Sequence, residues 1–85
     1  MQFFYTPYFL RQLKKLSPDI FEEAKEKIDL FKNQQNHSFL KTHKLKGSLD
    51  GTFSFSVNYS YRIIFEYYPE DSITFLAIGD HDVYK

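Results

Sequence analysis

The sequence predicts an α+β fold of the order β-α-α-β-β-β, in which a helical hairpin packs on one face of a mainly antiparallel four-stranded sheet. Apolar residues recur at helical spacing between residues 7 and 31, whereas apolar and polar residues alternate in residues 53–58. Turn residues separate the apolar runs of the second half. With 85 residues and no repeat or linker, the chain is expected to form a single domain, residues 1–85.

The first half is expected to contain a short strand and two helices. Residues 2–5 predict the strand, and Thr6-Pro7 predicts a helix start because Thr caps a helix and Pro suits its first position. Ser17-Pro18 repeats this signal, so a second helix follows almost at once and the two form a hairpin. The two apolar stripes are Phe9, Leu10, Leu13 and Leu16, then Ile20, Phe21, Ala24, Ile28 and Phe31.

The second half changes to the period of strands. Residues 53–58 alternate, residues 61–67 are apolar enough for a central strand, and residues 73–78 predict the last strand of a meander. Asn58–Ser60 and Tyr68–Ser72 carry the residues of tight turns.

The composition supports a compact core and excludes several chemistries. Ten Phe and seven Tyr, 20% of the chain, supply large apolar side chains. There is no Cys, which excludes a disulfide, a thiolate metal site and a catalytic thiol. The sequence shows no signal-peptide pattern at its start and no apolar stretch of about 20 residues. We therefore expect a cytoplasmic protein without membrane contact.

The charges are balanced overall but unevenly distributed. Eleven basic and eleven acidic side chains give a net charge of zero, yet residues 32–49 contain four Lys, two His and no acid. A locally basic segment can meet phosphate, so Lys44 and Lys46 are candidate phosphate-binding residues. The alternative is a solvated lysine-rich loop that binds nothing.

Three residues form a candidate site for RNA cleavage: His43 in the basic loop, Arg62 in the middle strand and His81 after the last strand. Cleavage without a metal needs a base for the 2′-hydroxyl, a cation for the phosphate and an acid for the leaving oxygen. Histidine suits both proton roles, since it titrates near neutral pH. Asp80 and Asp82 flank His81 and favour its charged form, so His81 is the expected acid and His43 the expected base.

Plainer interpretations remain open for each of these residues. A loop His commonly serves only as surface, and a strand Arg is often a salt-bridge partner, here for Glu66. Tyr84, near the C-terminus, could simply cover the core. The three His residues lack the spacing of a metal site, and the three Gly residues form no phosphate loop, so no metal or cofactor is expected.

The motifs of the second half resemble the RelE/ParE superfamily of toxins. Leu45-Lys46-Gly47 is followed by a Gly before an aromatic-rich strand, and Tyr61–Phe65 is an aromatic residue, an Arg and three apolar residues. Residues 78–84 resemble the Gly-x-His-x-x-Tyr-like tail of many members. The resemblance covers essentially the whole chain and implies the toxin component of a type II toxin-antitoxin system, of the RelE/YoeB/YafQ-like mRNA interferase kind.

The resemblance also implies roles for individual residues. His43 stands where YoeB-like toxins carry an acidic general base, and Arg62 matches the strand Arg that binds the scissile phosphate. His81 matches the family's general acid, Tyr84 a tail aromatic that positions the nucleotide, and Lys46 a phosphate contact.

The implied activity is metal-independent endoribonuclease cleavage of mRNA in the ribosomal A site, without a cofactor. An antitoxin with an extended segment that wraps the toxin is the implied partner. Some positions depart from the family: Phe53 and Phe55 replace lysines of RelE, and Ala77 replaces an Arg of YafQ-like members.

Two other interpretations belong to different functional classes. One is a ParE-like toxin that poisons DNA gyrase without catalytic His residues. The other is a degenerate toxin that only binds its antitoxin and helps to repress its own operon. The presence of both His43 and His81 favours the nuclease.

Overall fold

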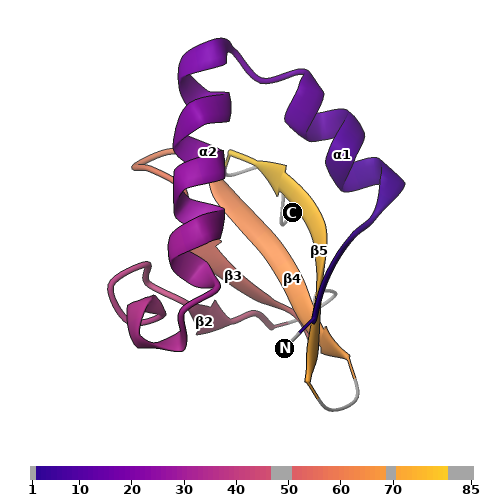
Figure 1. Cartoon of the computed structure of the whole chain (residues 1–85), viewed down its shortest axis with the longest axis vertical. Helices are drawn as coiled ribbons and strands as arrows, with labels where there is room; N and C mark the ends of the chain where they lie inside the picture. The colour runs from indigo at the N-terminus through magenta and orange to yellow at the C-terminus, as the bar shows by residue number, and fades with distance from the viewer. Residues whose placement is uncertain (1, 47–50, 69–70, 81–85) are drawn as a thin grey trace.

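The order of helices and strands is the predicted one, with one strand added. A computed structural model of the chain describes residues 2–46, 51–68 and 71–80 (Figure 1). Its elements are β1 (Gln2–Tyr5), α1 (Pro7–Lys14), α2 (Pro18–Phe31), the 3-10 turn η1 (Gln34–Asn36), β2 (His43–Lys44), β3 (Phe53–Ser56), β4 (Arg62–Tyr68) and β5 (Ser72–Gly79).

The strands form one mixed sheet of order β1-β5-β4-β3-β2. β1 is parallel to β5 and the other neighbours are antiparallel, which confirms the mainly antiparallel sheet. The predicted count of four strands was wrong, because His43 and Lys44, expected in a loop, pair with Ser54 and Phe53 as β2. A segment of two residues is too short to show an alternating pattern in the sequence. It becomes a strand because β3 offers an unpaired edge.

Local signals place the helices and anchor them to the sheet. Thr6 caps α1 as predicted: its Oγ1 accepts from the Phe9 amide at 3.0 Å and donates to the Leu76 carbonyl at 3.2 Å. Gln12 accepts from the Ile78 amide at 2.8 Å, beyond the point where β1 stops pairing with β5. In the described part of the chain, no helix is long and apolar enough to cross a membrane.

Both helices lie on the same face of the sheet, and the core fills the space between (Figure 1). Phe31 of α2 is at its centre, 1% exposed. Its ring stacks on Phe55 of β3 at 4.2 Å and meets Phe65 of β4 edge-on at 4.7 Å. On its other side the His37 ring stacks at 4.2 Å, while His37 Nε2 bonds the Phe31 carbonyl at the end of the helix.

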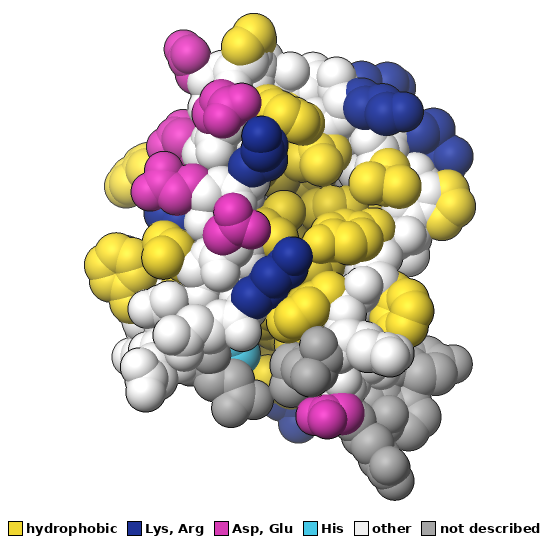
Figure 2. All heavy atoms as spheres, viewed as in Figure 1, with side chains coloured by type: hydrophobic (Ala, Val, Ile, Leu, Met, Phe, Trp, Pro, Cys, Tyr) yellow, Lys and Arg dark blue, Asp and Glu magenta, His cyan; other side chains and the backbone are white. Residues whose placement is uncertain are grey.

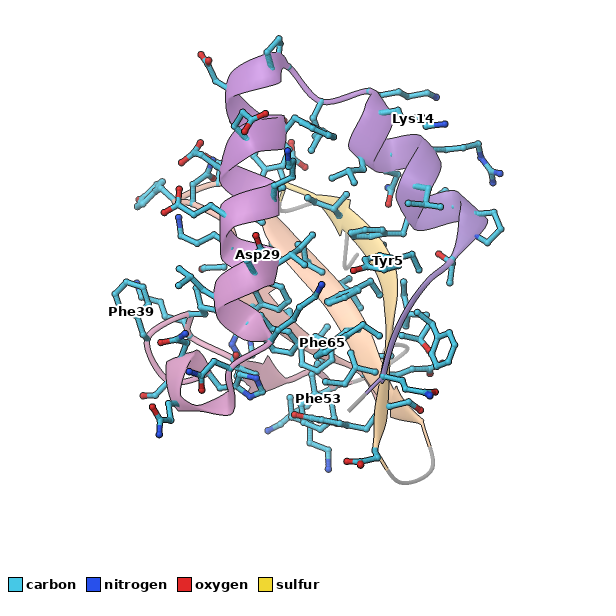
Figure 3. All side chains as sticks on the ribbon, in the orientation of Figure 1. Tyr5, Lys14, Asp29, Phe39, Phe53 and Phe65 are labelled. Atoms are coloured by element: carbon cyan, nitrogen blue, oxygen red, sulfur yellow. The ribbon has the colours of Figure 1, made fainter. Side chains whose placement is uncertain are left out.

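The two faces of the sheet differ in character, as the alternation predicts. Phe53 and Phe65 lie opposite one another on the helix side, where their rings stack at 5.7 Å (Figure 3). The partners Ser56 and Arg62 project from the other face, because side chains alternate along a strand. The sequence-based prediction that Arg62 points away from Ile63 and Phe65 is therefore confirmed.

Candidate functional site

Arg62, the first residue of β4, lies on the face of the sheet away from the helices, where it donates to three acceptors. Its Nε donates to Ser54 Oγ at 2.9 Å, Nη1 to Ser56 Oγ at 2.8 Å and Nη2 to the Lys41 carbonyl at 2.8 Å. These three acceptors are uncharged, and the bonds to them orient the guanidinium plane. The arrangement fixes the direction of the Arg62 cation.

The Lys41 carbonyl reaches the guanidinium through an unusual backbone conformation. Lys41 has φ 57°, in the left-handed region that costs a non-glycine residue roughly 1–2 kcal/mol. Leu40 is hydrogen-bonded to Ser56, and His43 pairs with Ser54. Two residues therefore lie between the paired positions on this segment but only one on β3, which makes a bulge of one extra residue. The strain lies at the candidate site, a common feature of functional segments.

The structure brings His43 directly to Arg62. His43 Nδ1 is 3.2 Å from Arg62 Nη2 and also 3.2 Å from the Lys41 carbonyl oxygen. With its proton on Nδ1 the ring donates to the carbonyl, and Nε2 then holds the lone pair that a general base needs. With the proton on Nε2, the Nδ1 lone pair accepts from the guanidinium instead. The two contacts favour opposite tautomers, and the one with the proton on Nδ1 leaves Nε2 able to accept a proton.

The other predicted site residues are placed differently. Lys44 pairs with Phe53 and so shares the helix-side face, opposite to His43. Lys46 is exposed just beyond β2, after the Leu45 amide bonds the Thr52 carbonyl. The general acid expected at His81 and the tail aromatic expected at Tyr84 lie outside the described residues.

A cleft of about 470 Å³ opens beside Arg62. Segment 39–41, the β3–β4 turn and α2 form its walls, and Figure 3 shows Phe39 on the side of α2 that faces away from α1. The volume falls within the range of roughly 300–1,000 Å³ that is typical of ligand sites. Arg62 therefore lines the cleft and also contacts His43, which is not itself part of the cleft wall.

Sequence reasoning missed the side chains that support this site. Ser54 and Ser56 looked like ordinary polar positions of an alternating strand, and only the register places them beside Arg62. Ser54 is 0% exposed, so its hydroxyl is a buried support and not a solvated one. No sequence signal marks the Lys41 carbonyl, because any residue has one. Among the described residues, no group of three or more His, Asp or Glu side chains is placed to hold a metal ion.

Comparison with known proteins gives a structural result only. No protein-family model matches the sequence, and no curated protein matches it. Solved structures do match, over nearly the whole chain.

These structures are toxins and toxin-antitoxin complexes. YafQ from E. coli matches with a TM-score of 0.81 and 16% identity, covering 98% of this chain and 96% of that one. The RelBE2 toxin-antitoxin complex from Mycobacterium tuberculosis matches with a TM-score of 0.70 and 22% identity, covering 94% and 96%. The archaeal RelE-RelB complex from Pyrococcus horikoshii matches with a TM-score of 0.73 and 16% identity, covering 96% of each chain. The chain therefore has the fold of RelE-, YoeB- and YafQ-like toxins, which confirms the resemblance at the level of fold.

Proposed function

We propose that this chain is the toxin of a type II toxin-antitoxin pair, a metal-independent endoribonuclease that cleaves mRNA, with the ribosomal A site as the place of action. The observation that carries the proposal is the direct contact between Arg62 and His43 on the sheet face away from the helices, 3.2 Å from Nη2 to Nδ1. A fixed cation beside a potential base is what a metal-free attack on phosphate requires.

In the proposed step, the 2′-oxygen of the RNA attacks the adjacent phosphorus while the bond from phosphorus to the 5′-oxygen breaks. His43 Nε2 takes the proton of the 2′-hydroxyl, and the Lys41 carbonyl supports the resulting imidazolium through Nδ1–H. Arg62 stabilises the added negative charge on the phosphate. The products carry a 2′,3′-cyclic phosphate and a 5′-hydroxyl.

His81 is proposed as the acid that protonates the departing 5′-oxygen. Support comes from β5, which ends at Gly79 directly opposite Arg62, two residues before His81 in the sequence. We further propose that Tyr84 positions the nucleotide and that Lys46 contacts a neighbouring phosphate. Lys44 stays a proposed phosphate contact. Its side chain projects from the same face of the sheet as Phe53, so it would reach the RNA around the edge strand β2.

The separation of charge supports approach of RNA despite a net charge of zero. Figure 2 shows acidic side chains gathered along α2 and basic ones along α1, both on the helix side of the molecule. Arg62 and His43 project from the opposite face of the sheet, and of the acids on α2 only Glu23 lines the cleft beside Arg62. A local positive field is sufficient to attract phosphate over the short distances that matter in salt.

The partner proposed for this toxin is a protein antitoxin. Apolar side chains are exposed in the hollow between α1 and α2 (Figure 2). Leu13 of α1 and Leu30 of α2 are only partly buried against the core. Exposed apolar patches of this kind commonly mark protein interfaces. Solved structures of the same fold include the YoeB-YefM toxin-antitoxin complex from Staphylococcus aureus.

The test is cleavage of a defined mRNA by the purified chain in excess EDTA, with and without ribosomes, followed by analysis of the product ends. We expect cyclic-phosphate and 5′-hydroxyl ends. Single substitutions His43→Ala and His81→Ala should each slow cleavage by roughly 10²–10⁴-fold. Arg62→Lys keeps a charge but loses the planar fork, and should also slow cleavage.

The same variants should lose the growth arrest that the wild-type chain causes on expression. Intact mRNA with undiminished arrest in all three variants would refute the nuclease, and DNA breaks in those cells would point to gyrase. Abolition of cleavage by EDTA would refute metal independence. Failure of the product of the adjacent open reading frame to bind the chain and relieve arrest would refute the antitoxin partner.

A further inference from the structure

The cleft beside Arg62 presents two aromatic side chains to solvent. Phe39 is 72% exposed and Tyr59 is 99% exposed, yet both line the same cleft. Neither side chain belongs to the hydrophobic core, which is built from other, buried residues. Exposed aromatic rings in a groove next to a cation are typical of sites where nucleic-acid bases stack.

A carboxylate is fixed in the wall of this cleft. Asn58 Nδ2 donates to Glu23 Oε1 at 3.1 Å, and Asn58 Oδ1 in turn accepts from the Ser60 and Tyr61 amides at 2.9 and 2.8 Å. Backbone amides of the β3–β4 turn therefore fix the Asn58 side chain, and that side chain fixes the carboxylate of Glu23 on α2. Glu23 keeps its second oxygen for another donor.

A lysine lies one helical turn from that carboxylate, and both line the cleft. Lys27 follows Glu23 by four residues on α2, so the two share one side of the helix. In the described part of the chain the only ion pair within 4.0 Å joins Lys25 and Glu22, so Glu23 and Lys27 are not paired at that distance. The wall thus offers an acceptor and a donor side by side to a bound molecule.

Guanine matches this pair best among the four bases. Its Watson–Crick edge carries two adjacent donors, N1–H and the N2 amino group, next to the acceptor O6. Adenine, cytosine and uracil each present a single donor beside an acceptor on the corresponding part of their edge. Each carboxylate oxygen has two acceptor sites, so Glu23 can accept both guanine donors beside the Asn58 bond while Lys27 donates to O6.

We infer that this cleft binds a guanine base of the RNA next to the phosphate held by Arg62. In this arrangement Phe39 and Tyr59 stack on the base and Glu23 reads its edge. The inference rests on the proposed ribonuclease function and adds a base preference to it. Three cations, Lys27, Lys41 and Arg62, line the cleft against one acid, which favours a nucleotide that belongs to a phosphate chain over an uncharged base.

The test is binding of 2′-O-methyl RNA pentamers, which lack the attacking hydroxyl and stay uncut. A uridine pentamer with one central guanosine is compared, by fluorescence anisotropy of the full chain, with pentamers carrying a central adenosine or uridine. We expect the guanosine pentamer to bind most tightly. Tyr59→Ala should weaken its binding by roughly 5- to 150-fold, the range for loss of one stacked base.

Two variants refine the test. Glu23→Gln should abolish the preference for guanosine over adenosine while leaving the adenosine pentamer bound as before. Tyr8→Ala is the matched control, because Tyr8 is a 54% exposed aromatic on α1, outside the cleft, and its loss should not change binding.

The inference is overturned if wild type binds the three pentamers equally, or if Tyr59→Ala binds the guanosine pentamer as wild type does. It is also overturned if 5′-GMP binds as tightly as the pentamer, which would assign the cleft to a free nucleotide. Arg62-dependent cleavage of mRNA without base preference would remove the guanine site and leave the proposed function intact. Preference for guanosine without any cleavage would keep the guanine site and refute the proposed nuclease.

Discussion

Replacing Ser54 with Ala tests whether the sheet holds the Arg62 guanidinium in place. The Ser54 hydroxyl accepts from Arg62 Nε at 2.9 Å, and Ser54 is 0% exposed, so water cannot replace the lost acceptor. A hydrogen bond to a charged donor contributes roughly 1.5–3 kcal/mol. We therefore expect the free energy of unfolding to fall by about 2 kcal/mol, from a total of roughly 4–13 kcal/mol for a domain of this size.

The assay is urea denaturation, in which the midpoint should fall while the slope with urea stays the same. The midpoint of thermal unfolding should fall by roughly 8–16 °C, at about 4–8 °C per kcal/mol. Ser56→Ala is the matched control. Its hydroxyl also accepts from Arg62, at 2.8 Å, but it is half-buried, so water can replace it and the loss should be under about 1 kcal/mol.

A double-mutant cycle identifies the source of the loss. In an Arg62→Met background, Ser54→Ala should cost close to nothing, since the donor is already gone, and the coupling energy should be about 2 kcal/mol. If Ser54→Ala costs as much in that background as in wild type, the lost free energy comes from packing of the strand. The role of Ser54 in orienting the guanidinium would then be wrong.

Three further substitutions test the core, a buried hydroxyl and alkaline stability. Thr42 Oγ1 is buried with no hydrogen-bond partner in the described part of the chain, so Thr42→Val should raise the urea midpoint, by about 1 kcal/mol of unfolding free energy; a lower midpoint would show that the hydroxyl is bonded. Phe31→Ala should cost roughly 3–5 kcal/mol in thermal unfolding because Phe31 is 1% exposed and stacks on Phe55, and a loss below about 1 kcal/mol would contradict its central place. Burial raises the pKa of Tyr67 above its ordinary value near 10, so the fold prefers the neutral phenol. Its contribution is complete below pH 10 and is lost as pH rises through the folded pKa, so Tyr67→Phe should make the alkaline decline in unfolding free energy shallower; an unchanged decline would show that another group causes it.

Local signals in the sequence were sufficient to predict most helices and strands, and the face of the sheet from which Arg62 projects. The Thr6-Pro7 start of α1 and the Asn58–Ser60 turn depend on hydrogen bonds between residues at most three apart, which neighbouring residues alone determine. The period of two along β4 likewise placed Arg62 on the face opposite Ile63 and Phe65. The resemblance to known toxins anticipated the fold that the structural comparisons confirm.

The residues that surround the Arg62 side chain were decided only by the tertiary structure. β2 exists because β3 leaves an edge to pair with, and the Lys41 carbonyl meets Arg62 across 21 residues of sequence. Glu23 meets Asn58 across 35 residues, from a helix to a turn. Such contacts depend on strand register and on how a helix seats on the sheet, and a shift of one residue would reverse every face. The period of two says which face each side chain takes, but not which residues of neighbouring strands lie opposite one another, because the packing of the whole core decides that.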